Sequence, residues 1–112
     1  MIHLLKILIL IAILLSSCSQ QDPFYVKQAC EEWTTAYAQW TSRCRGIDLE
    51  TAKEQIKFIE FKGDCANVQS IRDRDKLLST CVFAIRTTES CGSTDISEAL
   101  QMPECKQQFT LK

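Results

Sequence analysis

Residues 22–46 read DPFYVKQACEEWTTAYAQWTSRCRG, and this stretch decides the fold. Asp22 is a favourable N-cap residue, and Pro23 suits the first helical position because no backbone N–H is needed there. Six side chains with apolar character then recur at steps of three or four residues, and Gly46 follows the last of them. This spacing predicts one long helix whose buried face carries Val26, Cys30, Trp33, Tyr37, Trp40 and Cys44.

A second helix is predicted over residues 49–62. Asp48 is its expected N-cap, and Gly63 stands where a left-handed residue commonly follows a helix. The run Ile56-Lys57-Phe58 also alternates as a strand would, so a short strand is the alternative there. The expected apolar stripe of this helix consists of Leu49, Ala52, Ile56 and Ile59.

A third helix is predicted after a weakly patterned stretch at residues 64–72, which is expected to be a loop or one irregular turn. Asp73 or Ser70 can cap this helix, which should run to about Glu89. Its apolar positions at helical spacing are Leu77, Leu78, Cys81, Val82 and Ile85.

A short helical turn over residues 93–100 is predicted next, and Pro103 should end it. Phe109 and Leu111 then remain to pack against the domain or to fray. No internal repeat or second domain is evident, so residues 23–112 are expected to form one domain. The expected fold class is all-α, a small three- to four-helix bundle held by disulfides.

The amino terminus has the order of a secretory signal peptide. One basic side chain, Lys6, precedes an apolar run over residues 7–15, and small Ser16-Ser17 lead to Cys18. The apolar run is too short to span a bilayer. Residues 1–17 are therefore expected to be removed.

Leu15-Ser16-Ser17-Cys18 resembles the lipobox of bacterial lipoproteins, in which an aliphatic and two small residues precede a cysteine. The resemblance implies that acyl chains such as palmitate modify Cys18, that cleavage occurs on its amino side, and that the protein is anchored in a membrane. Two or three acyl chains hold a protein far more firmly than one. The alternatives are a conventional signal peptide cut a few residues later and an uncleaved anchor.

The cysteine count agrees with this reading. Seven cysteines are an odd number for a secreted chain, and lipidation of Cys18 leaves six. None of them forms a CxxC pair, which disfavours a zinc site or a thioredoxin-like centre, and no metal or other cofactor is expected. Three disulfides formed in an oxidising compartment are the better interpretation. Matching of helix ends predicts the pairs Cys30–Cys65, Cys44–Cys81 and Cys91–Cys105 out of fifteen arrangements.

Composition excludes several classes of function. Removing residues 1–17 from the 112 leaves 95 residues with 12 basic and 14 acidic side chains, a net charge of −2 that argues against a nucleic-acid partner. The only histidine, His3, lies in the signal peptide. Serine–histidine and cysteine–histidine nucleophile pairs are therefore absent, and the chain is not expected to be an enzyme.

The aromatic stripe Trp33, Tyr37 and Trp40 has two interpretations. These rings can form the core of a small domain, or they can line a groove for an apolar ligand or a peptidoglycan-derived sugar, because indole and phenol rings combine flat apolar faces with polar edges. The first interpretation is favoured, since a domain of this size can hardly spare three large aromatic side chains.

Residues 18–22 form the lipidated cysteine and a short tether. The four residues after Cys18 reach about 14 Å when extended, so the domain should sit almost on the membrane surface. Ser19 lacks the aspartate that retains many lipoproteins at an inner membrane. An extracytoplasmic envelope location is expected, on the outer membrane if the cell has one.

The domain is similar in style to uncharacterised cysteine-rich small bacterial lipoproteins, at residues 29–33, 81–85, Cys91 and 103–105. That class offers no activity to transfer. The leading hypothesis is a non-enzymatic, membrane-anchored interaction or structural module with an envelope protein partner. The alternatives are a small-ligand or lipid-binding carrier, and an inhibitor of an envelope hydrolase or an exclusion factor.

Overall fold

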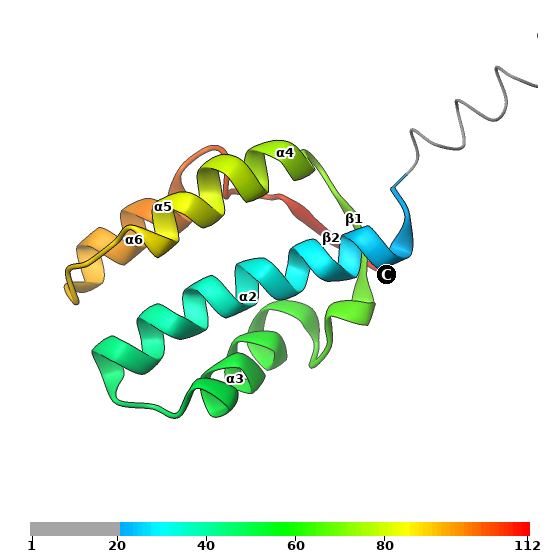
Figure 1. Ribbon diagram of the computed structural model, residues 1–112. Coiled ribbons are helices and arrows are strands. Elements are labelled where there is room, and N and C mark those ends of the chain that lie inside the picture. The colour runs from blue at the N-terminus through cyan, green and yellow to red at the C-terminus, as the bar shows by residue number, and fades with distance from the viewer. Residues whose placement is uncertain (1–20) are drawn as a thin grey trace, which may run out of the picture.

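A computed structural model describes residues 21–112 of the chain, and the predicted signal peptide and the predicted lipidation site at Cys18 lie outside them. The described part is an all-α bundle with one small two-stranded ribbon (Figure 1). None of its helices is both long enough and apolar enough to cross a membrane. The elements in chain order are α2 (Pro23–Arg45), α3 (Leu49–Phe61), η1 (Cys65–Asn67), β1 (Val68–Ile71), α4 (Arg74–Lys76), η2 (Leu77–Val82), α5 (Phe83–Arg86), α6 (Ser93–Gln101) and β2 (Phe109–Leu111).

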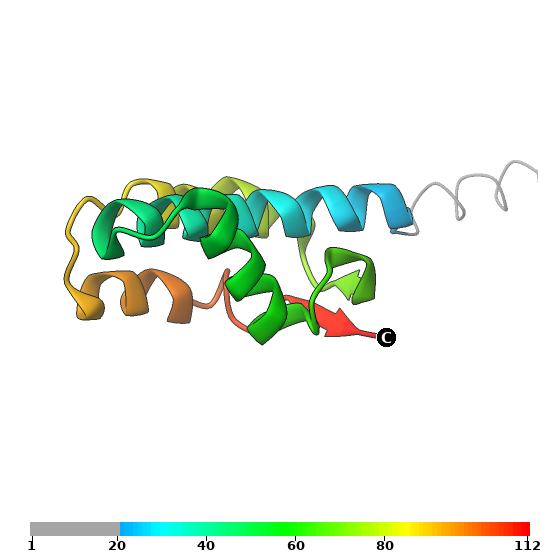
Figure 2. The same ribbon diagram turned by 90° about the horizontal axis from the view of Figure 1, so that it is seen from below.

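The central helix is α2, with α3 on one flank and the continuous α4–η2–α5 helix on the other (Figure 1). α6 and β2 lie together on one side of the layer that α2 and α5 form (Figure 2). In both views the start of α2 and the carboxyl terminus lie at the same end of the molecule. We call this the tether end, because the chain enters the domain there.

The predicted helix is confirmed as α2, but Tyr37 and Cys44 of the predicted stripe are only partly buried. The Asp22 carboxylate accepts a hydrogen bond from the Phe24 N–H at 2.8 Å, and Gly46 ends the helix with a left-handed φ of 70°. The buried face is wider than the predicted stripe because small side chains also face the core: Val26, Ala29, Cys30, Trp33, Thr34, Ala36, Ala38 and Trp40.

α3 begins as predicted, with the Asp48 carboxylate accepting from the Thr51 N–H at 3.3 Å. It ends one residue early, because Lys62 already adopts the left-handed conformation at φ 54°. The predicted stripe is wrong at Ile59, which is 75% exposed, whereas Phe61 is buried at 1%. Periodicity within α3 could not show this, because a distant residue, Phe109, packs on Phe61 with ring centroids 4.9 Å apart.

The stretch at residues 64–72, expected to be a loop or one irregular turn, contains the short 3-10 turn η1 and also the strand β1, which was not predicted. β1 pairs antiparallel with β2, so that Ile71 faces Phe109 and Val68 faces Leu111. Each strand is too short to give a recognisable alternating pattern in the sequence, and the pairing joins segments that lie far apart in the chain. The carboxyl-terminal segment is therefore held and does not fray.

The third helix begins at the predicted cap, where the Asp73 carboxylate accepts from the Lys76 N–H at 3.0 Å. Its middle, η2, is π-helical, and the helix ends at Arg86, short of the predicted Glu89. Because π-helical hydrogen bonds span one more residue than α-helical ones, the residues after η2 are rotated about the helix axis relative to a purely α-helical pattern. Leu77, Cys81, Val82 and Ile85 are nevertheless buried as expected.

The disulfides are Cys30–Cys65, Cys44–Cys91 and Cys81–Cys105. The first agrees with the prediction, and the predicted pairs Cys44–Cys81 and Cys91–Cys105 are wrong.

The reason is that α2 and the third helix run parallel at a nearly constant offset in sequence. The Arg74 guanidinium lies over the Tyr25 ring, the Trp40 Nε1 donates to the Ser90 carbonyl, and Arg43 donates to the Glu89 carbonyl. Residues that lie side by side across these two segments are 45 to 50 positions apart in sequence, and this offset places Cys91, not Cys81, beside Cys44.

Peptide mapping of the unreduced protein should recover linked peptides that join Cys44 to Cys91 and Cys81 to Cys105. The paired substitution Cys44→Ala and Cys91→Ala should lower the free energy of unfolding by about 2–4 kcal/mol, because it frees a long loop in the unfolded chain. Chemical denaturation measures the loss. A Cys44–Cys81 linkage in the map would contradict the structure.

Candidate functional site

The aromatic stripe of α2 forms part of the core. Trp33 is only 7% exposed and packs edge-to-face on three rings, those of Tyr37, Phe61 and Phe109, with centroids 5.5 to 5.7 Å away. These contacts join α2, α3 and β2 into one cluster. Trp33 is therefore largely enclosed by its neighbours and is not an open platform for a ligand.

Trp40 is also closed off. It is 4% exposed, its Nε1 donates to the Ser90 carbonyl at 3.0 Å, and the Arg45 guanidinium lies 4.9 Å from the ring centroid. Of the three residues suggested for a groove, only Tyr37 is half-buried, and the other two are buried. Trp33 and Trp40 therefore belong to the core and Tyr37 packs against it, and the three do not form an open aromatic groove in the described part of the chain.

A pocket of about 370 Å³ lies beside Tyr37, between α2, the end of α3, α6 and the carboxyl-terminal segment. Its lining combines a phenol, a carboxylate (Glu60), an ammonium group (Lys106) and apolar rings. Burial raises the pKa of Tyr37, the Glu60 carboxylate raises it further, and the Arg45 guanidinium opposes both. The remaining lining residues are Trp33, Phe61, Leu100, Gln101, Cys105, Gln107, Gln108, Phe109 and Leu111.

A different surface stands out on the outer side of α3. Phe58 and Ile59 are 77% and 75% exposed, side by side on one helix. With Thr51, Glu54 and Gln55 they line a shallow hollow of about 380 Å³. We call these five residues the α3 patch. Large apolar side chains exposed together commonly mark an interaction surface.

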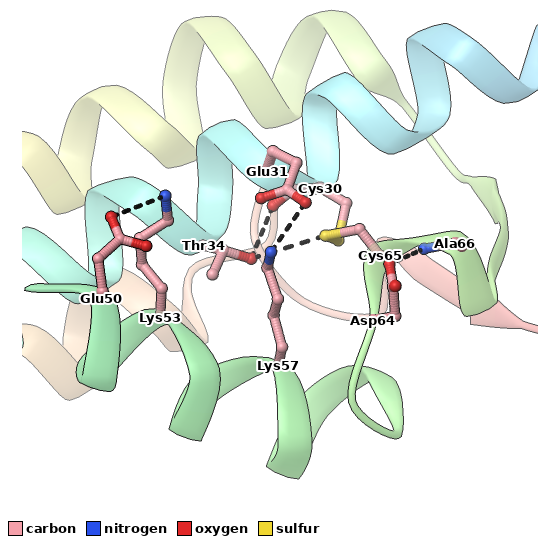
Figure 3. Close-up of polar contacts among 9 residues, drawn as sticks. All are labelled: Cys30, Glu31, Thr34, Glu50, Lys53, Lys57, Asp64, Cys65 and Ala66. Carbon is pink, nitrogen blue, oxygen red and sulfur yellow. Dashed lines mark hydrogen bonds and ion pairs between the residues drawn. A yellow bond between two sulfur atoms is a disulfide. The ribbon is translucent and has the colours of Figure 1, made fainter.

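The inner side of α3 is fixed to α2. The Lys57 ammonium lies 2.9 Å from the Glu31 carboxylate, and the Cys30–Cys65 disulfide ties the segment after α3 to the same turn of α2 (Figure 3). The Thr34 hydroxyl donates to the Cys30 carbonyl at 2.8 Å and lies 3.9 Å from the Cys65 sulfur (Figure 3). The helix that carries the α3 patch is thus fixed to α2 on its inner side.

The sequence contains one sign of the α3 patch, a large apolar residue outside the predicted apolar stripe of the helix. Phe58 lies off the centre of the expected stripe, so the helical pattern does not place this large apolar residue in the core. Phe61, also off the stripe, packs on Phe109, whereas Phe58 stays 77% exposed among the described residues.

Within residues 21–112, no group of three or more histidine, cysteine, aspartate or glutamate side chains is placed to hold a metal ion. Comparison with known proteins found no matching family model, no matching curated protein and no matching solved structure.

The raised pKa of Tyr37 makes stability depend on pH in the alkaline range. Because the neutral phenol is favoured in the folded state, its contribution is present below the ordinary pKa of 10.0 and is lost as the pH rises through the folded value. Tyr37→Phe should reduce this alkaline loss, and Glu60→Gln should lower the pKa of Tyr37. Phenolate absorbance and denaturation midpoints across the alkaline range measure both effects. An unchanged Tyr37 titration in Glu60→Gln would show that the carboxylate does not act on it.

Proposed function

We propose that the protein is a membrane-anchored, non-enzymatic lipoprotein of the bacterial envelope that binds a protein partner through the α3 patch. The observation that carries the proposal is the pair Phe58 and Ile59, exposed side by side on a helix fixed to α2. The lipobox-like residues 15–18 and the three disulfides support an extracytoplasmic, lipid-anchored location.

Charge around the patch suggests the chemistry of the partner. Lys57 of α3 pairs with Glu31 on the α2 side, and Lys53 lies 3.7 Å from Glu50. Among the described residues, Glu54 in the patch forms no ion pair. An apolar partner surface with a basic rim would complement this arrangement.

The pocket beside Tyr37 favours a second candidate, the binding of a small amphipathic ligand. Its volume of about 370 Å³ is near the lower end of the range typical of ligand sites. Glu60 and Lys106 would orient polar groups of the ligand, and the half-buried Tyr37 would contact its apolar part. Native mass spectrometry of the purified protein would detect such a ligand.

The α3 patch should form a specific contact in intact cells. A photo-crosslinking amino acid at position 58 should give a discrete adduct, and the same amino acid at position 83 should not, because Phe83 is similarly exposed but lies on α5. Adding Ile59→Asp should remove the adduct, since a charge in an apolar contact is costly. The identified partner should then bind the purified variant at least about tenfold more weakly. Equal adducts from positions 58 and 83 would rule out the patch.

The lipid anchor should depend on Cys18 alone. In the wild-type protein, the amino-terminal peptide should carry acyl chains on Cys18, and the protein should sediment with membranes. Cys18→Ser should lose the acyl mass and leave the membrane fraction, because the remaining contacts are weaker than two acyl chains. Mass spectrometry and fractionation measure both. A processed chain that begins after Cys18 would support the conventional signal peptide instead.

A further inference from the structure

Gln21, the first described residue, is bound to the edge of the β ribbon. Its side-chain Oε1 accepts from the Ile71 N–H at 2.6 Å, and its Nε2 donates to the Ile71 carbonyl. One amide side chain thus satisfies both backbone groups of a residue, as a neighbouring strand would. On the other edge of β1, the ribbon is closed by β2.

This contact shortens the free part of the tether. Only Ser19 and Gln20 separate Cys18 from Gln21. Three Cα–Cα steps of 3.8 Å span at most about 11 Å, so an anchor on Cys18 cannot move far from the bound Gln21. A domain attached so closely has little freedom to present another end to the bilayer.

The tether end also carries exposed aromatic side chains. Phe24 is 68% exposed and Tyr25 is 50% exposed, and both belong to the first turn of α2. Their rings pack edge-to-face at 5.6 Å, and the Arg74 guanidinium lies 5.1 Å from the Tyr25 ring centroid. Aromatic rings beside a cation are typical of the membrane–water interface, where the ring faces lipid and the polar group faces the headgroups.

We propose that the tether end is a second membrane contact, in which Phe24 and Tyr25 enter the interface of the bilayer that holds the anchor. The two hydrogen bonds between Gln21 and Ile71, which we call the clamp, fix the orientation of the domain on that bilayer. This inference rests on the proposed lipid anchor, which supplies the bilayer as the occupant of the aromatic surface.

The orientation has a direct consequence for the far end of the domain. α2 has 23 residues and is therefore about 34 Å long. With its first turn in the interface and its axis pointing outward, the Cys44–Cys91 disulfide and Gly46 stand farthest from the lipid.

Isotope-labelled, acylated protein in nanodiscs of phosphatidylethanolamine and phosphatidylglycerol tests the proposal, with a nitroxide on the lipid headgroup. The amide signals of Phe24, Tyr25 and Arg74 should lose intensity, and those of Gly46 and Gly92 should keep it. Gln21→Ala should flatten this gradient because it frees the tether. Phe24→Ser with Tyr25→Ser should weaken it because it removes the interfacial contact.

Phe83→Ser is the matched control, since it removes a similarly exposed phenylalanine away from the tether end, and it should leave the gradient unchanged. Loss of intensity that is equal at Phe24 and Gly46 in an acylated protein overturns the orientation and leaves the anchor intact. A Gln21→Ala variant that keeps the wild-type gradient of intensity also overturns the orientation. A purified chain without acyl mass overturns the anchor and the orientation together.

Discussion

Burial of one face of α2 is the constraint on which the rest of the domain depends. α3 packs on one flank of this helix and the third helix on the other, and small residues such as Ala29, Ala36 and Ala38 let these neighbours approach closely. Two of the three disulfides have a cysteine on α2. Without this helix, α3 would lose its ion pair with Glu31, η1 would lose its disulfide to Cys30, and the segment that contains Cys91 would lose its disulfide to Cys44. A domain of this size has no second core to replace it.

Local signals predicted the helices, because caps and helical spacing depend on neighbouring residues. Asp22, Asp48 and Asp73 each cap the helix that the sequence assigned to them. The β ribbon and two disulfides were missed, because they depend on the offset between parallel helices and on the path of the last segment. Gln108 illustrates this: its buried side chain accepts from the Asp73 N–H and donates to the Glu104 carbonyl, and so links the start of the third helix to the carboxyl-terminal segment. A glutamine in a polar stretch gives no sign of such a role.

The same distinction applies to the candidate site. Helical spacing placed Trp33 and Trp40 on the buried face, and the structure explains why they are covered: α3, β2 and the segment around Ser90 close over them. The α3 patch is exposed because α3 is an outer helix of the bundle. α3 meets α2 through Ala52 and Ile56, and among the described residues no further layer covers its outer side. Sequence alone shows that Phe58 is displaced from the stripe, but not which displaced residue finds a partner within the fold.

The two exposed apolar surfaces have different environments if the anchor holds the tether end against lipid. Phe24 and Tyr25 lie at the level of the clamp formed by Gln21 and Ile71. α3 starts at the far end of α2 and returns toward the bilayer, and nine residues of helix bring Phe58 back by only about 14 Å. The α3 patch then stands on the order of 20 Å above the first turn of α2, beyond the interface in which aromatic rings contact lipid. Lipid can cover Phe24 and Tyr25. A protein partner is the occupant that can reach Phe58 and Ile59.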